Sequence, residues 1–91
     1  MNKYQQSIQE ELDLHQMTKD EARQEVRAFL DEAETLGYKK IRIITGKGIH
    51  SESGVGVLNS YVKELLDNAG YKYCNAKYNE GGEGAIDVSI R

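Results

Sequence analysis

Three short segments of the sequence carry residues suited to chemistry on a phosphate ester. They are Leu12-Asp13-Leu14-His15, Thr45-Gly46-Lys47-Gly48 and Gly81-Gly82-Glu83-Gly84. Asp13 and His15 are two residues apart, so on a strand they share one face. An imidazole can take a proton from an attacking water, and a carboxylate can orient the water or help to bind a metal ion. The pair predicts acid–base chemistry, although the same spacing is also typical of a solvated strand face.

The second segment continues as a loop to Ser51. Its glycines allow the backbone to approach a phosphate, and free N–H groups near a helix start favour an anion. The alternative is a glycine-rich connection in which a serine only caps the next helix. The spacing is not that of a Walker A motif, and Ser51 replaces the third glycine of a dinucleotide fingerprint. The candidate binding residues are Thr45, Gly46, Lys47, Gly48, His50 and Ser51, together with Gly82 and Gly84 of the third segment.

Other polar and aromatic residues give weaker signals. Glu83 is a second carboxylate that would join Asp13 on a divalent ion, but two scattered carboxylates are little evidence for a metal site. Cys74 is the single cysteine and is interpreted as an inert strand residue. Three tyrosines offer rings for base stacking, and packing is the favoured interpretation: Tyr71, Tyr73 and Tyr78.

Length and composition indicate one small domain. The chain has 91 residues, a net charge of −3 and no long apolar run that would span a membrane. Residues 1–37 carry four basic and nine acidic side chains, whereas residues 38–91 carry eight and six, so a local basic patch is compatible with the sequence. A single cysteine and a polar N-terminus favour the cytoplasm. We expect a flexible arm over residues 1–10, a domain over residues 11–91, and a protein that is plausible as a monomer.

The hydrophobic pattern predicts the elements that position these segments. Residues 11–15, 39–45, 71–78 and 85–91 have the character of strands. A helix follows Thr18, whose capping box with Glu21 marks its start, and Gly37 ends it. A second helix over residues 55–69 ends at Gly70. The apolar stripes expected on these helices are Ala22, Val26, Phe29, Leu30, Ala33 and Leu36, then Val55, Leu58, Val62, Leu65, Leu66 and Ala69.

The order β-α-β-α-β-β predicts an α/β two-layer sandwich. Strand–helix–strand units give parallel strands through right-handed crossovers, so both helices are expected on one face of a mixed four-stranded sheet. The other face is expected to be polar, with Asp13, His15, Asp87 and Ser89. Because the first three strands are parallel, the three chemical segments should emerge together at the carboxyl edge, where ligands of open α/β sheets bind.

The three motifs in this order resemble the Smr (small MutS-related) domain, and the resemblance covers nearly the whole chain from about Glu11. It implies the sheet order 1-2-4-3, a fold similar to the C-terminal domain of initiation factor three, and an endonuclease that nicks DNA or cleaves RNA. It also implies links to DNA repair or recombination, or to RNA quality control. By the same resemblance, Asp13 and His15 are linked to catalysis, and Gly46, Lys47 and Gly48 to nucleic-acid binding. The chain departs from the family at Gln16, where a glycine usually follows the histidine, and at Ile86, where a threonine is usual.

The expected partner is DNA or RNA, without a membrane. One alternative is a non-catalytic binding module, because Gln16 would crowd a phosphate approaching His15. Another is a protein-interaction domain that uses Arg23 and Arg27 on the first helix. No compact set of metal ligands is present in the sequence, which leaves open whether Mg²⁺ or Mn²⁺ takes part.

Overall fold

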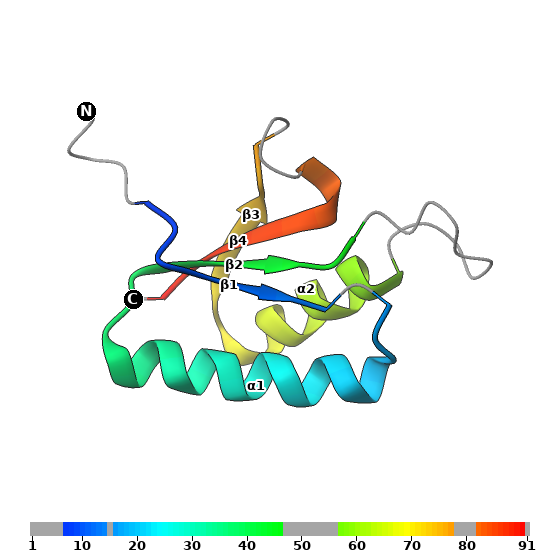
Figure 1. Ribbon diagram of the computed structural model, residues 1–91, viewed down its shortest axis with the longest axis horizontal. Coiled ribbons are helices and arrows are strands. Elements are labelled where there is room, and N and C mark those ends of the chain that lie inside the picture. Colours follow the sequence, from blue (N-terminus) through cyan, green and yellow to red (C-terminus); the bar gives the residue numbers. More distant parts are fainter. Residues whose placement is uncertain (1–6, 15, 47–56, 78–81, 91) are drawn as a thin grey trace.

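A computed structural model describes residues 7–14, 16–46, 57–77 and 82–90 (Figure 1). Its elements, in chain order, are β1 (Glu10–Asp13), α1 (Lys19–Leu36), β2 (Lys40–Ile44), α2 (Val57–Ala69), β3 (Lys72–Asn75), the short 3₁₀ helix η2 (Gly82–Gly84) and β4 (Ala85–Ser89). Within these ranges, neither helix is long and apolar enough to cross a membrane.

Helix α1 begins and ends where the sequence predicts. The Thr18 side chain accepts a hydrogen bond from the Glu21 N–H, and the Glu21 carboxylate accepts one from the Thr18 N–H. At the other end, Gly37 has a φ of 76° and its N–H bonds to the last turn. The expected stripe is buried except for Leu36, the last residue of the helix, which is 55% exposed. The buried members are Ala22, Val26, Phe29, Leu30 and Ala33.

Helix α2 packs its own stripe against the same core. Val62 and Leu66 are fully buried, and Leu58 and Leu65 are partly buried against the core. Ala69, the last residue of the helix, is exposed, contrary to expectation. The helix ends at Gly70, which has a φ of 84° and donates its N–H to the Asp67 carbonyl. Val55 lies outside the described residues.

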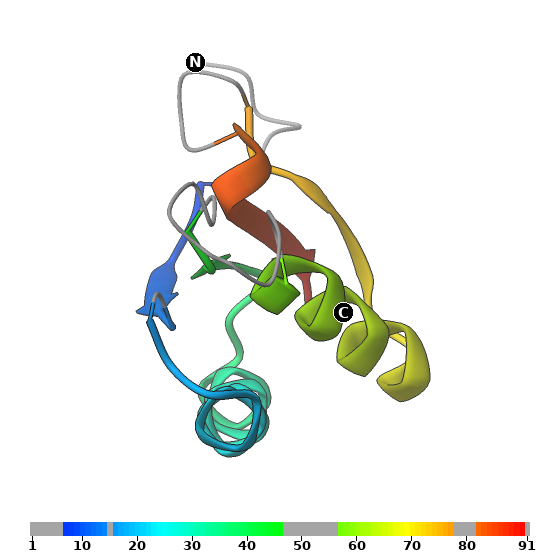
Figure 2. The same ribbon diagram turned by 90° about the vertical axis from the view of Figure 1, so that its right-hand side faces the viewer.

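The sheet has the expected order β1-β2-β4-β3. Strand β2 pairs in parallel with β1 and antiparallel with β4, and β4 pairs antiparallel with β3. The first three strands therefore run in one direction. Both helices lie on the same side of the sheet, as Figure 2 shows. The predicted two-layer α/β sandwich with a mixed sheet is confirmed.

Strand β1 is shorter than predicted, since it ends at Asp13 rather than at position 15. Its start is anchored by Gln9, whose N–H donates to the Lys40 carbonyl, and Glu10 is the first residue of the strand. The division into an arm over residues 1–10 and a domain from residue 11 stays a prediction, because residues 1–6 lie outside the described ranges.

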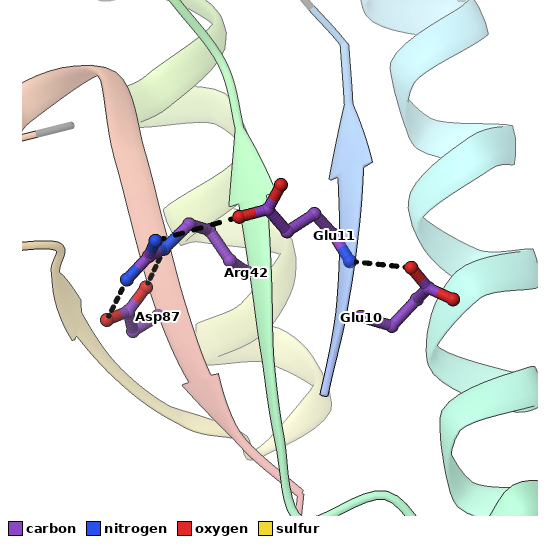
Figure 3. A network of polar contacts seen from close by, with 4 residues as sticks. All are labelled: Glu10, Glu11, Arg42 and Asp87. Carbon is purple, nitrogen blue, oxygen red and sulfur yellow. Dashed lines mark hydrogen bonds and ion pairs between the residues drawn. The ribbon is translucent and has the colours of Figure 1, made fainter. Parts of the chain in front are cut away.

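The sheet face without helices carries a buried ion pair at its centre (Figure 3). Arg42 of β2 donates from Nε to Asp87 Oδ1 at 2.7 Å and from Nη2 to Asp87 Oδ2 at 3.2 Å. Glu11 of β1 lies 3.6 Å from Nη1 on the other side. Asp87 was expected on a solvated face; it lies on that face, but it is only 8% exposed. The correction follows from the register, which sets Arg42 directly opposite Asp87 in the two central strands.

We expect Asp87→Ala to lower the free energy of unfolding by about 3–5 kcal/mol, because it leaves a buried guanidinium without its bidentate partner. The matched change Glu11→Ala removes a carboxylate that is 52% exposed, and its cost should stay below about 1 kcal/mol. Urea denaturation of both variants measures the difference. Equal losses would show that Asp87 is not the principal partner of Arg42.

Candidate functional site

The ends of β1 and β2 and the start of β4 meet at one edge of the sheet. The Leu14 N–H donates to the Ile44 carbonyl at 2.6 Å, so the residue after Asp13 lies beside the end of β2. The N–H groups of Thr45 and Gly46 donate to the Gly84 carbonyl at 2.9 and 3.0 Å. These contacts connect parts of all three sequence segments. The predicted convergence of the segments is therefore present among the described residues, although β4 contributes its amino end.

A buried polar cluster holds this edge together. The Thr45 hydroxyl lies 3.3 Å from the Gly84 carbonyl oxygen and 3.2 Å from the Gly46 carbonyl oxygen, and it donates to one of them. Asn59 of α2 donates from Nδ2 to Thr45 Oγ1 at 3.3 Å. Thr45 and Asn59 are 5% and 8% exposed, so water cannot readily replace these bonds.

This cluster corrects one expectation for the second segment. Thr45 and Gly46 were expected among the residues that bind a phosphate, but their N–H groups are both used by the Gly84 carbonyl. Gly46 has a φ of 78°, a left-handed conformation that glycine adopts without strain. Thr45 and Gly46 therefore fix the base of the loop, and any backbone donors for a phosphate must come from later residues. Lys47, Gly48, His50 and Ser51 lie outside the described residues.

Asn59 is the residue of the cluster that the sequence interpretation missed. It precedes Val62 by three residues and Leu66 by seven, so it falls on the buried stripe of α2. A polar residue at a core position of an amphipathic helix needs a hydrogen-bonding partner. The position of Asn59 on the buried stripe was therefore the sequence signal for a buried hydrogen bond. It does not indicate which residue Asn59 bonds to.

Asp13 ends β1 and pairs in register with Ile44, the residue before Thr45. Its neighbour Leu12 packs on the core, so Asp13 lies on the opposite, helix-free face and is exposed. His15 lies outside the described residues, and its proximity to Asp13 stays a prediction from the sequence. Gly82 of the third segment was also predicted to bind nucleic acid. It has a φ of 52° and donates its N–H to the Lys77 carbonyl.

Among the described residues, no group of three or more histidine, cysteine, aspartate or glutamate side chains is placed to hold a metal ion. The side chain of Glu83 is not among those described, so its pairing with Asp13 stays untested. Cys74 is exposed on β3 as a free thiol.

Two tyrosines serve as packing residues, as the sequence favoured. Tyr71 and Tyr73 pack on the core. The Tyr71 hydroxyl donates to Glu34, and the Tyr73 hydroxyl donates to Asp67 at 3.0 Å. The bond to Asp67 also raises the pKa of Tyr73 above its ordinary value. Tyr78 lies outside the described residues.

Both helices begin at the same edge as this cluster, as Figure 1 shows. The amino end of a helix carries a partial positive charge, which favours an anion nearby. The first turn of α1 is acidic, with Asp20 and Glu21, whereas the first turn of α2 contains no acidic residue. Among the described residues, the start of α2 therefore adds no negative charge at this edge, whereas the start of α1 does.

A model of the Smr domain family matches residues 12–91. The chain belongs to the Smr domain family. It is 35% identical to the Endonuclease MutS2 of Finegoldia magna, over 99% of this chain and 11% of that protein. It is 34% identical to the Probable DNA endonuclease SmrA of Escherichia coli, over 91% of this chain and 46% of that protein. The chain thus spans about a tenth of the MutS2 relatives.

Solved structures show the same fold. The Smr domain of Thermus thermophilus MutS2 superposes with a TM-score of 0.80 at 33% identity, covering 90% of this chain and 98% of that one. YdaL, a stand-alone small MutS-related protein from Escherichia coli, gives a TM-score of 0.79 at 32% identity, covering 89% of this chain and 63% of that one.

We expect Asn59→Ala to destabilise the domain relative to Asn68→Ala, an exposed control on the same helix. Both variants make the same chemical change in α2, so the difference measures the buried contacts of Asn59, including its bond to Thr45. That difference should be about 1–3 kcal/mol, because the change leaves buried groups without their partner. Thermal and urea unfolding provide the measurement. Indistinguishable variants would show that Asn59 does not hold the edge.

Proposed function

We propose that the chain is a nucleic-acid-binding endonuclease domain that cleaves phosphodiester bonds at the carboxyl edge of its sheet. One observation supports this most strongly. Three separate stretches of chain meet at that edge: Leu14, next to Asp13, bonds to Ile44, and the following Thr45 and Gly46 bond to Gly84. Membership of the Smr family and relatives named endonucleases support the same conclusion.

In the proposed reaction, His15 takes the proton of a water that attacks the phosphorus atom. A bond forms between the water oxygen and phosphorus, the bond from phosphorus to the leaving sugar oxygen breaks, and that oxygen takes up a proton from solvent to become an alcohol. Asp13, exposed at the end of β1, orients the imidazole or the water and stabilises the positive charge that His15 acquires. No step in this scheme requires a metal ion, and the experiment below includes a chelator to test that.

The phosphate is held on the α2 side of the edge. Thr45 and Gly46 set the base of the loop, while Lys47, Gly48, His50 and Ser51 supply positive charge and polar donors. Gly82 and Gly84 keep the third segment close to the strand. The first turn of α2 adds no competing carboxylate, and its helix dipole favours the negative charge that develops on the phosphate oxygens.

DNA is the substrate we favour, because one relative is named a probable DNA endonuclease. RNA is included as a test substrate. A cytoplasmic protein is consistent with Cys74, which is a free thiol on the surface.

The test is cleavage of supercoiled plasmid and of structured RNA by the wild type, His15→Ala and Asp31→Asn, each with and without a chelator. His15→Ala should lower the cleavage rate roughly a hundredfold or more, because it removes the general base. Asp31 is an exposed residue in the second half of α1, and its variant should cleave like the wild type.

Equal cleavage by wild type and His15→Ala would exclude His15 as the catalyst. Binding without cleavage by the wild type would instead identify a binding module of the Smr fold. Loss of cleavage with the chelator would add a metal ion to the mechanism.

A further inference from the structure

One residue at the candidate edge has a backbone conformation that its side chain disfavours. Gln16 has a φ of 68°, and among the described residues it alone combines a positive φ with a side chain. The left-handed region is costly for residues with a Cβ atom and free of that cost for glycine. Strained residues of this kind cluster at functional sites, where surrounding structure holds them in place.

The contacts on both sides of Gln16 fix this conformation. The Met17 N–H donates to the Leu14 carbonyl at 2.8 Å, which closes a tight turn between these residues. Leu14 is fully buried and bonded to Ile44, and Met17 packs on the core. A turn whose third residue has a positive φ normally has glycine or asparagine there. These contacts therefore hold the turn in place, and Gln16 adopts the positive φ despite its energetic cost.

The side chain of Gln16 does not offset the strain by packing, since it is exposed. It follows His15 directly in sequence, and the turn that carries it begins beside the end of β2. Its carboxamide carries two N–H donors and one oxygen acceptor without charge. Phosphate oxygens take much of the hydrogen bonding between proteins and nucleic acids. An uncharged donor at this place suits a phosphate next to the one attacked.

We propose that the Gln16 carboxamide donates a hydrogen bond to a backbone phosphate of the bound strand, which makes Gln16 a binding residue of the site. This rests on the proposed function. It reverses the interpretation that a side chain at this position only obstructs the phosphate. The strain in the turn is then retained because glycine, although better for the backbone, lacks the donor.

The test compares Gln16→Gly, Gln16→Ala and Gln16→Glu with the wild type, using a fluorescently labelled DNA duplex and the matching single strand in anisotropy titrations. Gln24→Ala, at an exposed position on α1, is the matched control. Gly and Ala should weaken binding by about three- to tenfold, the loss of one hydrogen bond. Glu should weaken it further, because a carboxylate repels the phosphate. The slope of log Kd against log salt should stay that of wild type for Gly and Ala, since no charge is lost.

Thermal unfolding separates this role from a structural one. Gln16→Gly should raise Tm by about 2–6 °C by relieving the strain, while Gln16→Ala should not. A higher Tm together with weaker DNA binding in the glycine variant supports the proposal. Binding by the glycine and alanine variants equal to that of the wild type overturns it and leaves the proposed function intact. A wild type that binds neither DNA probe and does not bind the structured RNA overturns both.

Discussion

The candidate site depends on one acceptor, the carbonyl oxygen of Gly84. It accepts the N–H groups of both Thr45 and Gly46, and the Thr45 hydroxyl lies beside it. This contact joins the end of β2 to the start of β4 at the point where the central pairing of the sheet stops. Asn59 adds α2 to the same cluster through Thr45. The end of β2, where the second segment begins, is therefore held in a fixed position, and fixed positioning is what the proposed phosphate binding needs.

The fold could be predicted from the sequence because its signals are local. Thr18 and Glu21 form the capping box that their spacing indicates, and Gly37 and Gly70 end the helices. The right-handed crossover rule then places both helices on one side of the sheet. The position of β4 between β2 and β3 was predicted from the family resemblance alone. The local signals indicate that β3 and β4 form an antiparallel hairpin, but they do not show which of the two strands pairs with β2.

The finer features of the site could not be predicted, because they depend on contacts across the sheet. Asp87 occupies a polar position in a strand of alternating apolar and polar residues, which is typical of a solvated side chain. Only its register with Arg42 shows that it is buried in an ion pair. Thr45 and Gly46 belong to a glycine loop, and only the proximity of Gly84 shows that their N–H groups are already used. On the helix-free face, the positive charge of Arg42 is matched by carboxylates on both sides (Figure 3). This pairing supports the proposal that nucleic acid binds along the carboxyl edge.

The most direct test of this account is a titration of ¹⁵N-labelled protein with the DNA duplex, followed by amide chemical shifts. The account predicts that the largest changes occur at the carboxyl edge and that the opposite end of the molecule does not respond. The amides expected to move are Asp13, Leu14, Gln16, Thr45, Gly46 and Gly84, and those expected to stay are Gly37, Gly70 and Ile90. Shifts centred on Arg42 and Asp87, or at the opposite end, would contradict it.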